Sequence, residues 1–141
     1  MSAETQNMVS WNTWMHQADR QWEAARANEE SGIHHVACFL YHQAAEMAVK
    51  AGLERAGVDE MGPALPPLVR MLVRARGEDV PDGLEDAAKR LNPLYIETRY
   101  PDKKKDVVPA TLYGANESAQ ARTDVQAILD YVRSADHAAG R

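Results

Sequence analysis

Apolar residues recur along this chain at helical spacing, and three long segments carry the pattern. They run from about residue 11 to 28, from about 33 to 56 and from about 116 to 135. In the first segment the apolar positions follow one another at steps of four and three: Trp11, Met15, Ala18, Trp22 and Ala25. Such spacing places the side chains on one face of a helix. We predict three long helices, with these tryptophans packed in a core rather than exposed as platforms for base stacking.

The second segment is apolar around more of its circumference than the other two. Its apolar positions are Ile33, Val36, Ala37, Leu40, Ala44, Met47, Ala48 and Ala51, and Cys38, Phe39 and Tyr41 widen the stripe. Gly57 follows, where a left-handed residue would end the helix. A helix apolar over so much of its surface lies either at the centre of a bundle or in an interface between two copies.

Prolines and glycines divide the rest of the chain into shorter elements. Pro66 and Pro67 can open a third helix that ends at Gly77, and a turn at residues 81–83 precedes a fourth helix. We expect Tyr95 to face inward from that helix and Pro93 to kink or end it. A loop of about fifteen residues, 100–114, then leads to the last helix. No segment alternates as a strand does, so the predicted fold is all-α, an up-and-down bundle of four to five helices.

Length and composition indicate one domain spanning residues 1–141, with its core at about 10–133 and frayed termini. The net charge of −5 argues against non-specific binding along a duplex, but it leaves a local phosphate site open. Cys38 is the only cysteine, which excludes an internal disulfide and fits a reducing cytosol. The N-terminal residues do not resemble a signal peptide, and no apolar run is long enough to span a membrane. We expect a cytoplasmic protein without a membrane partner.

Positive charge is concentrated in one stretch, residues 95–105, which reads YIETRYPDKKK. Arg99 supplies a planar guanidinium that can hold two phosphate oxygens at once. Three consecutive lysines add mobile charges close by: Lys103, Lys104 and Lys105. This pattern indicates a phosphate-binding site, for a nucleotide or RNA. The alternative is a solvated loop between two helices, as most charge runs are.

The second helix carries a polar row: His35, His42, Gln43, Glu46 and Lys50. This row could line a cleft that faces the segment around Arg99 (residues 95–105, the arginine loop). It could also form ordinary contacts such as a Glu46–Lys50 ion pair. We expect no metal, because no second pair of ligands on another helix completes a site. We also expect no cofactor, since the chain has no glycine-rich phosphate loop, and Cys38 should be inert packing.

Two motifs in this chain resemble those of the HEPN family: FLYHQAAEMAVKAGLERAG at residues 39–57 and LYIETRYPD at residues 94–102. The resemblance implies a helical bundle that forms a homodimer, with a cleft between protomers lined by the second helix and the arginine loop. It also implies a possible minimal nucleotidyltransferase partner in a toxin–antitoxin pair. Active members are metal-independent ribonucleases that use an arginine followed, after four to six residues, by a histidine.

Arg99 matches the family's arginine, but this chain departs from the rest of that motif. Lys104, Lys105 and Asp106 occupy the positions where the histidine would stand. Asp106 also takes the place of a tyrosine that the partner enzyme modifies in some toxin members. A histidine transfers protons near neutral pH, whereas an exposed lysine stays protonated. Phosphate binding therefore survives this departure better than catalysis does.

Three functional hypotheses follow. The first is a module that binds a nucleotide or a partner through Arg99 and the lysines, with Tyr100 and Asp102 lining the cleft. The second is a ribonuclease in which Arg99 acts with Lys104, His42 or His35. The third is a purely structural role, in which Arg99 bridges to a carboxylate such as Glu46.

Overall fold

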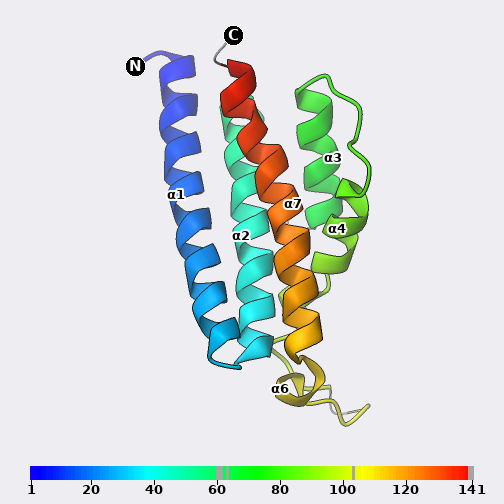
Figure 1. Cartoon of the computed structure of the whole chain (residues 1–141). Coiled ribbons are helices and arrows are strands. Elements are labelled where there is room, and N and C mark those ends of the chain that lie inside the picture. Colours follow the sequence, from blue (N-terminus) through cyan, green and yellow to red (C-terminus); the bar gives the residue numbers. More distant parts are fainter. Residues whose placement is uncertain (60–61, 63, 103, 140–141) are drawn as a thin grey trace.

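A computed structural model describes residues 1–59, 62, 64–102 and 104–139, and they fold into a bundle of helices. Three long helices lie side by side: α1 (Ala3–Glu30), α2 (His34–Arg55) and α7 (Ala115–Ala139) (Figure 1). Two shorter helices, α3 (Leu65–Ala75) and α4 (Leu84–Leu91), complete the bundle, and α5 (Leu94–Glu97) and α6 (Pro109–Leu112) are single turns. The all-α prediction is confirmed. No helix in the described ranges is both long and apolar enough to cross a membrane.

The two ends of α1 show what periodicity detects and what it misses. The helix begins at Ala3, well before the predicted start near Trp11, because Ser2 caps it: its Oγ accepts the Thr5 N–H at 3.1 Å. The extra turns are mostly exposed and therefore carry no apolar stripe. At the other end, Gly32 takes a left-handed φ of 78° and turns the chain into α2.

The helix α2 is the central element of the bundle, which confirms one of the two alternatives for its apolar surface. It packs against α1, α3, α5, α6 and α7. Its small residues allow close approach: a Cβ added to Gly52 would lie 2.9 Å from Cδ1 of Leu72 on α3. Helices of the same chain therefore cover much of the apolar circumference of α2, while Val36, Phe39, Leu40 and Met47 are only half-buried. The interface alternative for this surface stays a prediction.

The segment after α4 differs in part from its prediction. Pro93 ends the helix as expected, since α4 stops at Leu91 and α5 starts at Leu94. The interruption changes which side chains face the core: Leu94 is buried, and Tyr95, predicted to face inward, is 36% exposed. The predicted fifteen-residue loop contains the turn α6, which Pro109 opens at its first position.

Candidate phosphate-binding site

Arg99 lies just after α5, and aromatic rings surround its guanidinium. The centre of the guanidinium is 4.7 Å from the centroid of the Phe39 ring, 4.6 Å from that of Tyr95 and 5.0 Å from that of Tyr100. Its Nε donates a hydrogen bond to the Tyr95 carbonyl oxygen at 2.8 Å. Within the described part of the chain, Arg99 forms no ion pair. Its position is therefore fixed through the rings and Nε, while its terminal nitrogens retain their donors for a ligand.

The structural hypothesis for Arg99 fails in the form that paired it with Glu46. Glu46 Oε2 instead accepts a hydrogen bond from Lys50 Nζ at 2.8 Å, and the two side chains are only 16% and 9% exposed. The alternative prediction of a Glu46–Lys50 ion pair is confirmed. Among the described residues, Glu46 pairs with Lys50 and not with Arg99.

The lysines follow Arg99 on a short turn that is closed by backbone hydrogen bonds. Asp102 and Val107 bond to each other through both N–H groups, each at 3.0 Å, and Asp102 Oδ1 accepts the N–H of Lys104 at 3.0 Å and of Lys105 at 3.3 Å. The side chains of Lys104 and Lys105 are exposed, and Lys103 lies outside the described residues. The segment projects beyond the end of the bundle next to α6 (Figure 1). Asp102 thus shapes the turn, and its neighbours supply the charge.

His42 lies beneath the aromatic rings rather than beside the ligand surface. The residue is fully buried, its ring centroid is 5.6 Å from that of Tyr95, and its Nδ1 is 3.3 Å from Gln43 Oε1. Its Nε2 has no hydrogen-bond partner among the described residues. Burial lowers the pKa of His42. The positive charges of Arg99 and Lys50 lower this pKa further, whereas Glu46 and Gln43 raise it. His42 is therefore neutral at neutral pH, and in this conformation it does not reach the surface.

The remaining residues of the predicted cleft are placed unevenly. His35 is half-buried in the first turn of α2, Gln43 is half-buried next to His42, and Tyr100 is 59% exposed against Arg99. The polar row therefore does not form one open wall, because His42 and Lys50 are buried. In the described ranges, no three His, Cys, Asp or Glu side chains are grouped so that they could hold a metal ion.

Sequence reasoning missed a hollow of about 400 Å³ next to Tyr95. It is lined by Ala64, Asn92, Pro93, Tyr95, Ile96 and Glu97. Two of the polar groups are already oriented: Asn92 Oδ1 accepts the Leu65 N–H at 2.9 Å, and Glu97 Oε2 accepts the Tyr113 O–H at 3.2 Å. Burial, with the nearby Glu97 charge, raises the pKa of Tyr113 to about 12, so the phenol stays a donor. One related signal in the sequence is the position of Tyr95 four residues before Arg99, a spacing at which side chains of a helix can meet.

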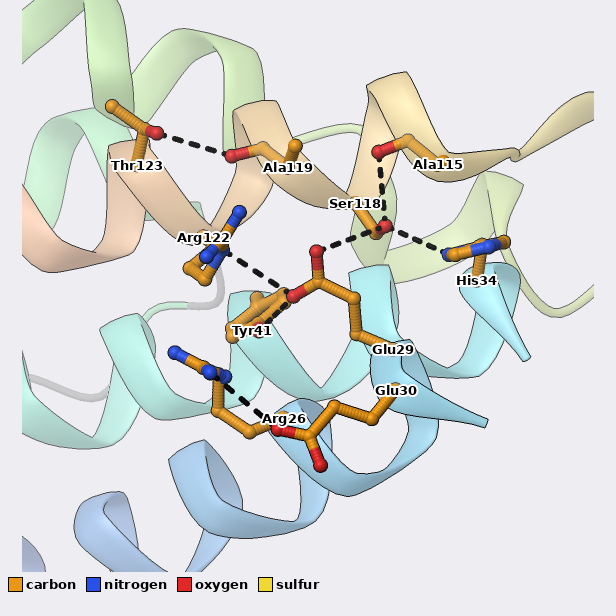
Figure 2. A network of polar contacts seen from close by, with 10 residues as sticks. All are labelled: Arg26, Glu29, Glu30, His34, Tyr41, Ala115, Ser118, Ala119, Arg122 and Thr123. Atoms are coloured by element: carbon orange, nitrogen blue, oxygen red, sulfur yellow. Dashed lines mark hydrogen bonds and ion pairs between the residues drawn. The ribbon is translucent and has the colours of Figure 1, made fainter. Parts of the chain in front are cut away.

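A second polar region joins the ends of α1, α2 and α7, and Figure 2 shows it. Glu29 lies at its centre: Oε1 accepts the Tyr41 O–H at 2.5 Å and is 3.4 Å from Arg122 Nε, and Oε2 is 3.5 Å from Ser118 Oγ. His34 Nδ1 lies 2.8 Å from the same Ser118 Oγ. Every helix in this junction contributes a partner for the carboxylate or for Ser118. The region is a structural network that fixes three helices.

Cys38 lies close to this network and is buried, as predicted. Burial, together with the charges of Glu117 and Glu29, raises the pKa of its thiol to about 12. The thiolate is the nucleophilic form of cysteine. Cys38 therefore packs as a small apolar residue and offers no nucleophile at neutral pH.

Comparisons with known proteins agree with this geometry. The family model described as HEPN domain matches residues 11–135. The fold is similar to that of TT1696 from Thermus thermophilus, with 33% identity over 88% of this chain and 96% of that chain and a TM-score of 0.82. It is also similar to that of ST0689, an archaeal HEPN homologue, with 28% identity over 88% of this chain and 95% of that chain and a TM-score of 0.73. A HEPN domain protein from Thermotoga maritima is similar as well, with 25% identity over 86% of this chain and 95% of that chain and a TM-score of 0.68. No curated protein matches the chain.

Proposed function

Because this chain belongs to the HEPN family of nucleotide-related modules, we propose that it binds a nucleotide or RNA phosphate through Arg99, Lys104 and Lys105. The observation that carries the proposal is the state of Arg99. Three rings and one backbone hydrogen bond hold its guanidinium, and no carboxylate among the described residues neutralises it. A charge held in place without a partner is suited to a ligand of opposite charge.

The two kinds of cation contribute differently to binding. Arg99 offers paired N–H donors in a fixed plane, which match two oxygens of one phosphate. Lys104 and Lys105 are exposed on the turn, so they attract the ligand over a longer range and are screened by salt. The protein as a whole is acidic, with a net charge of −5. We therefore expect a local site rather than an extended nucleic-acid surface.

The proposal is tested by equilibrium titration of ATP and of a short RNA against the wild type, Arg99→Ala and Arg74→Ala. Arg74 is an exposed arginine on α3 that serves as a control with the same change in charge. We expect Arg99→Ala to weaken binding about tenfold or more, since a charge-assisted hydrogen bond contributes about 1.5–3 kcal/mol. Arg74→Ala should leave the affinity unchanged. If neither ligand binds the wild type saturably, the proposal is wrong.

The family resemblance also supports a homodimer and a minimal nucleotidyltransferase as partners. In this chain, apolar side chains are exposed around the arginine loop: Ile96, Val108 and Leu112. Such residues are typical of a surface that a partner covers. Light scattering over a range of concentrations tests the dimer, and a monomer at every concentration would contradict it. Purification with a co-expressed nucleotidyltransferase tests the other partner and a toxin–antitoxin role.

A ribonuclease is the second candidate, and one observation favours it. The buried His42 Nε2 has no partner among the described residues, and the Tyr95 ring that covers His42 also contacts Arg99. Proton transfer requires His42 to come within hydrogen-bond reach of the RNA, which its burial prevents in this conformation. Cleavage of a mixed-sequence RNA without added metal, by the wild type, Arg99→Ala and His42→Ala, tests this function. Cleavage that both variants lose would support it, and no cleavage by the wild type would contradict it.

A further inference from the structure

The hollow beside α5 adjoins Arg99 through a shared side chain. The Tyr95 ring lies 4.6 Å from the Arg99 guanidinium and also forms a wall of the hollow. A nucleotide whose phosphate is bound to Arg99 could therefore place its base in this hollow, past the Tyr95 side chain. Its volume is about 400 Å³, within the range of small-ligand pockets, which is roughly 300–1,000 Å³.

The walls of the hollow suit a flat aromatic ring. Pro93, Tyr95 and Ile96 are among its lining residues, and Ile96 is 57% exposed in the isolated chain. Bases of single-stranded nucleic acids stack on aromatic and apolar side chains of this kind. Insertion of a base would remove this apolar surface from water.

Two polar residues line the hollow, one able to donate and one able to accept hydrogen bonds. Asn92 uses Oδ1 to accept the Leu65 N–H, which leaves its Nδ2 group as a donor. Glu97 uses Oε2 to accept the Tyr113 O–H, which orients the carboxylate and leaves Oε1 as an acceptor. Since both residues line the same hollow, a ligand that offers donors to Glu97 and an acceptor to Asn92 matches it.

We infer that this hollow binds the base of the ligand and selects guanine. Guanine carries two adjacent N–H donors, N1–H and the N2 amino group, which one carboxylate can accept together, and its O6 accepts from an amide. Adenine and cytosine place an acceptor nitrogen beside their amino group, which repels a carboxylate. Uracil offers a single N–H donor between two carbonyl groups. Guanine is therefore the common base that matches both groups.

This inference rests on the proposed phosphate site and is tested by titrating GMP, IMP, AMP, CMP and UMP against the wild type. We expect GMP to bind about tenfold more tightly than AMP, because AMP places an acceptor nitrogen, rather than a donor, against the Glu97 carboxylate. IMP lacks the N2 amino group and should bind with intermediate affinity. Glu97→Gln should lower the affinity for GMP to the level of AMP. The carbonyl oxygen of the substituted amide can still accept the Tyr113 O–H, and a thermal melt checks that the variant folds.

Two controls separate the possible failures. Glu4→Gln makes the same change in charge in the first turn of α1 and should keep the preference for GMP. Equal affinity for all five nucleotides, or a GMP preference that Glu97→Gln leaves intact, would overturn the inference while the phosphate site stands. No binding of any nucleotide or of RNA would overturn the proposed phosphate site as well. Arg99→Ala should weaken the binding of all five nucleotides by a similar factor, because each carries the same phosphate, and a loss confined to GMP would contradict this division of roles.

Discussion

Two charged regions lie at the same end of the bundle: in one the charge has partners of the same chain, and in the other it has no counter-ion among the described residues. The Glu29 network surrounds a carboxylate of α1 with a phenol from α2 and with a guanidinium and a hydroxyl from α7 (Figure 2). Arg99 is held by rings and one backbone carbonyl, with no carboxylate beside it in the described part of the chain. A charge neutralised inside the fold stabilises the fold. A charge that is positioned and left without a counter-ion stabilises a complex instead.

The largest effect should come from removing the centre of the network. Glu29→Ala leaves the Tyr41 hydroxyl and Arg122 without their carboxylate, so we expect the free energy of unfolding to fall by about 2–3 kcal/mol. Urea unfolding measures this change. The matched control is Glu30→Ala, whose carboxylate is 71% exposed and 3.5 Å from Arg26. It should change stability by less than about 0.5 kcal/mol, and equal losses in both variants would contradict the role of Glu29.

The pH dependence of stability tests the interior beneath Arg99. The pKa of His42 is lowered in the folded protein, so below about pH 6.5 the unfolded chain binds a proton that the folded chain does not. Stability should therefore be fully present above that pH and fall as the pH decreases, by at most about 1.4 kcal/mol per pH unit. His42→Leu should remove this part of the slope, and His16→Gln, on the exposed side of α1, should retain it. Urea unfolding at several pH values between about 5 and 7.5 measures the free energy of unfolding as a function of pH. If this pH dependence is the same for the wild type and His42→Leu, the prediction is wrong.

Removal of Arg99 should change stability little, which separates it from Glu29. The contacts with Phe39, Tyr95 and Tyr100 are cation–π interactions at an exposed residue, worth about 0.5–1 kcal/mol. We expect Arg99→Ala to lower the free energy of unfolding by no more than about 1 kcal/mol, and urea unfolding measures the change. A loss as large as that of Glu29→Ala would revive the structural hypothesis for Arg99 and weaken the proposed function.

The smallest effect should come from the lysine turn. Replacement of Lys104 and Lys105 together by alanine removes exposed charges, so we expect a few-fold loss of affinity at low salt that disappears at high salt. Titrations at about 50 and 300 mM NaCl measure the dependence. If the loss is the same at both concentrations, these lysines contact the ligand directly rather than attract it at long range.

Sequence periodicity identified the long helices because burial imposes the spacing it detects. Apolar periodicity missed the start of α1, because the first turns are mostly exposed and the helix begins at a serine cap rather than at an apolar residue. It also placed Tyr95 in the core, because the apolar spacing of α4 was continued past Pro93, whereas the new turn α5 changes which side chains face inward.

The candidate site was predictable only in its charged residues. Arg99 and the lysines are neighbours in sequence, so their concentration is visible without a structure. Phe39 lies sixty positions from Arg99, and nothing local indicates that its ring contacts the guanidinium. Asn92 and Glu97 look like ordinary helix-end residues until the fold places them around one hollow. Residues that reach the site only through tertiary contacts could therefore not be predicted from the sequence alone.

The closure of the turn by Asp102 and Val107 has a consequence for how this protein can evolve. Backbone atoms of these two residues close the turn, and the Asp102 carboxylate orders it from within. The side chains of Lys104 and Lys105 point into solvent and take no part in the closure, whereas Asp106 has a positive φ of 54°, which favours Asp, Asn or Gly. Descendant sequences can therefore exchange the lysines for histidine or acidic residues without refolding the bundle. A few substitutions in this turn are therefore enough to add or remove an activity.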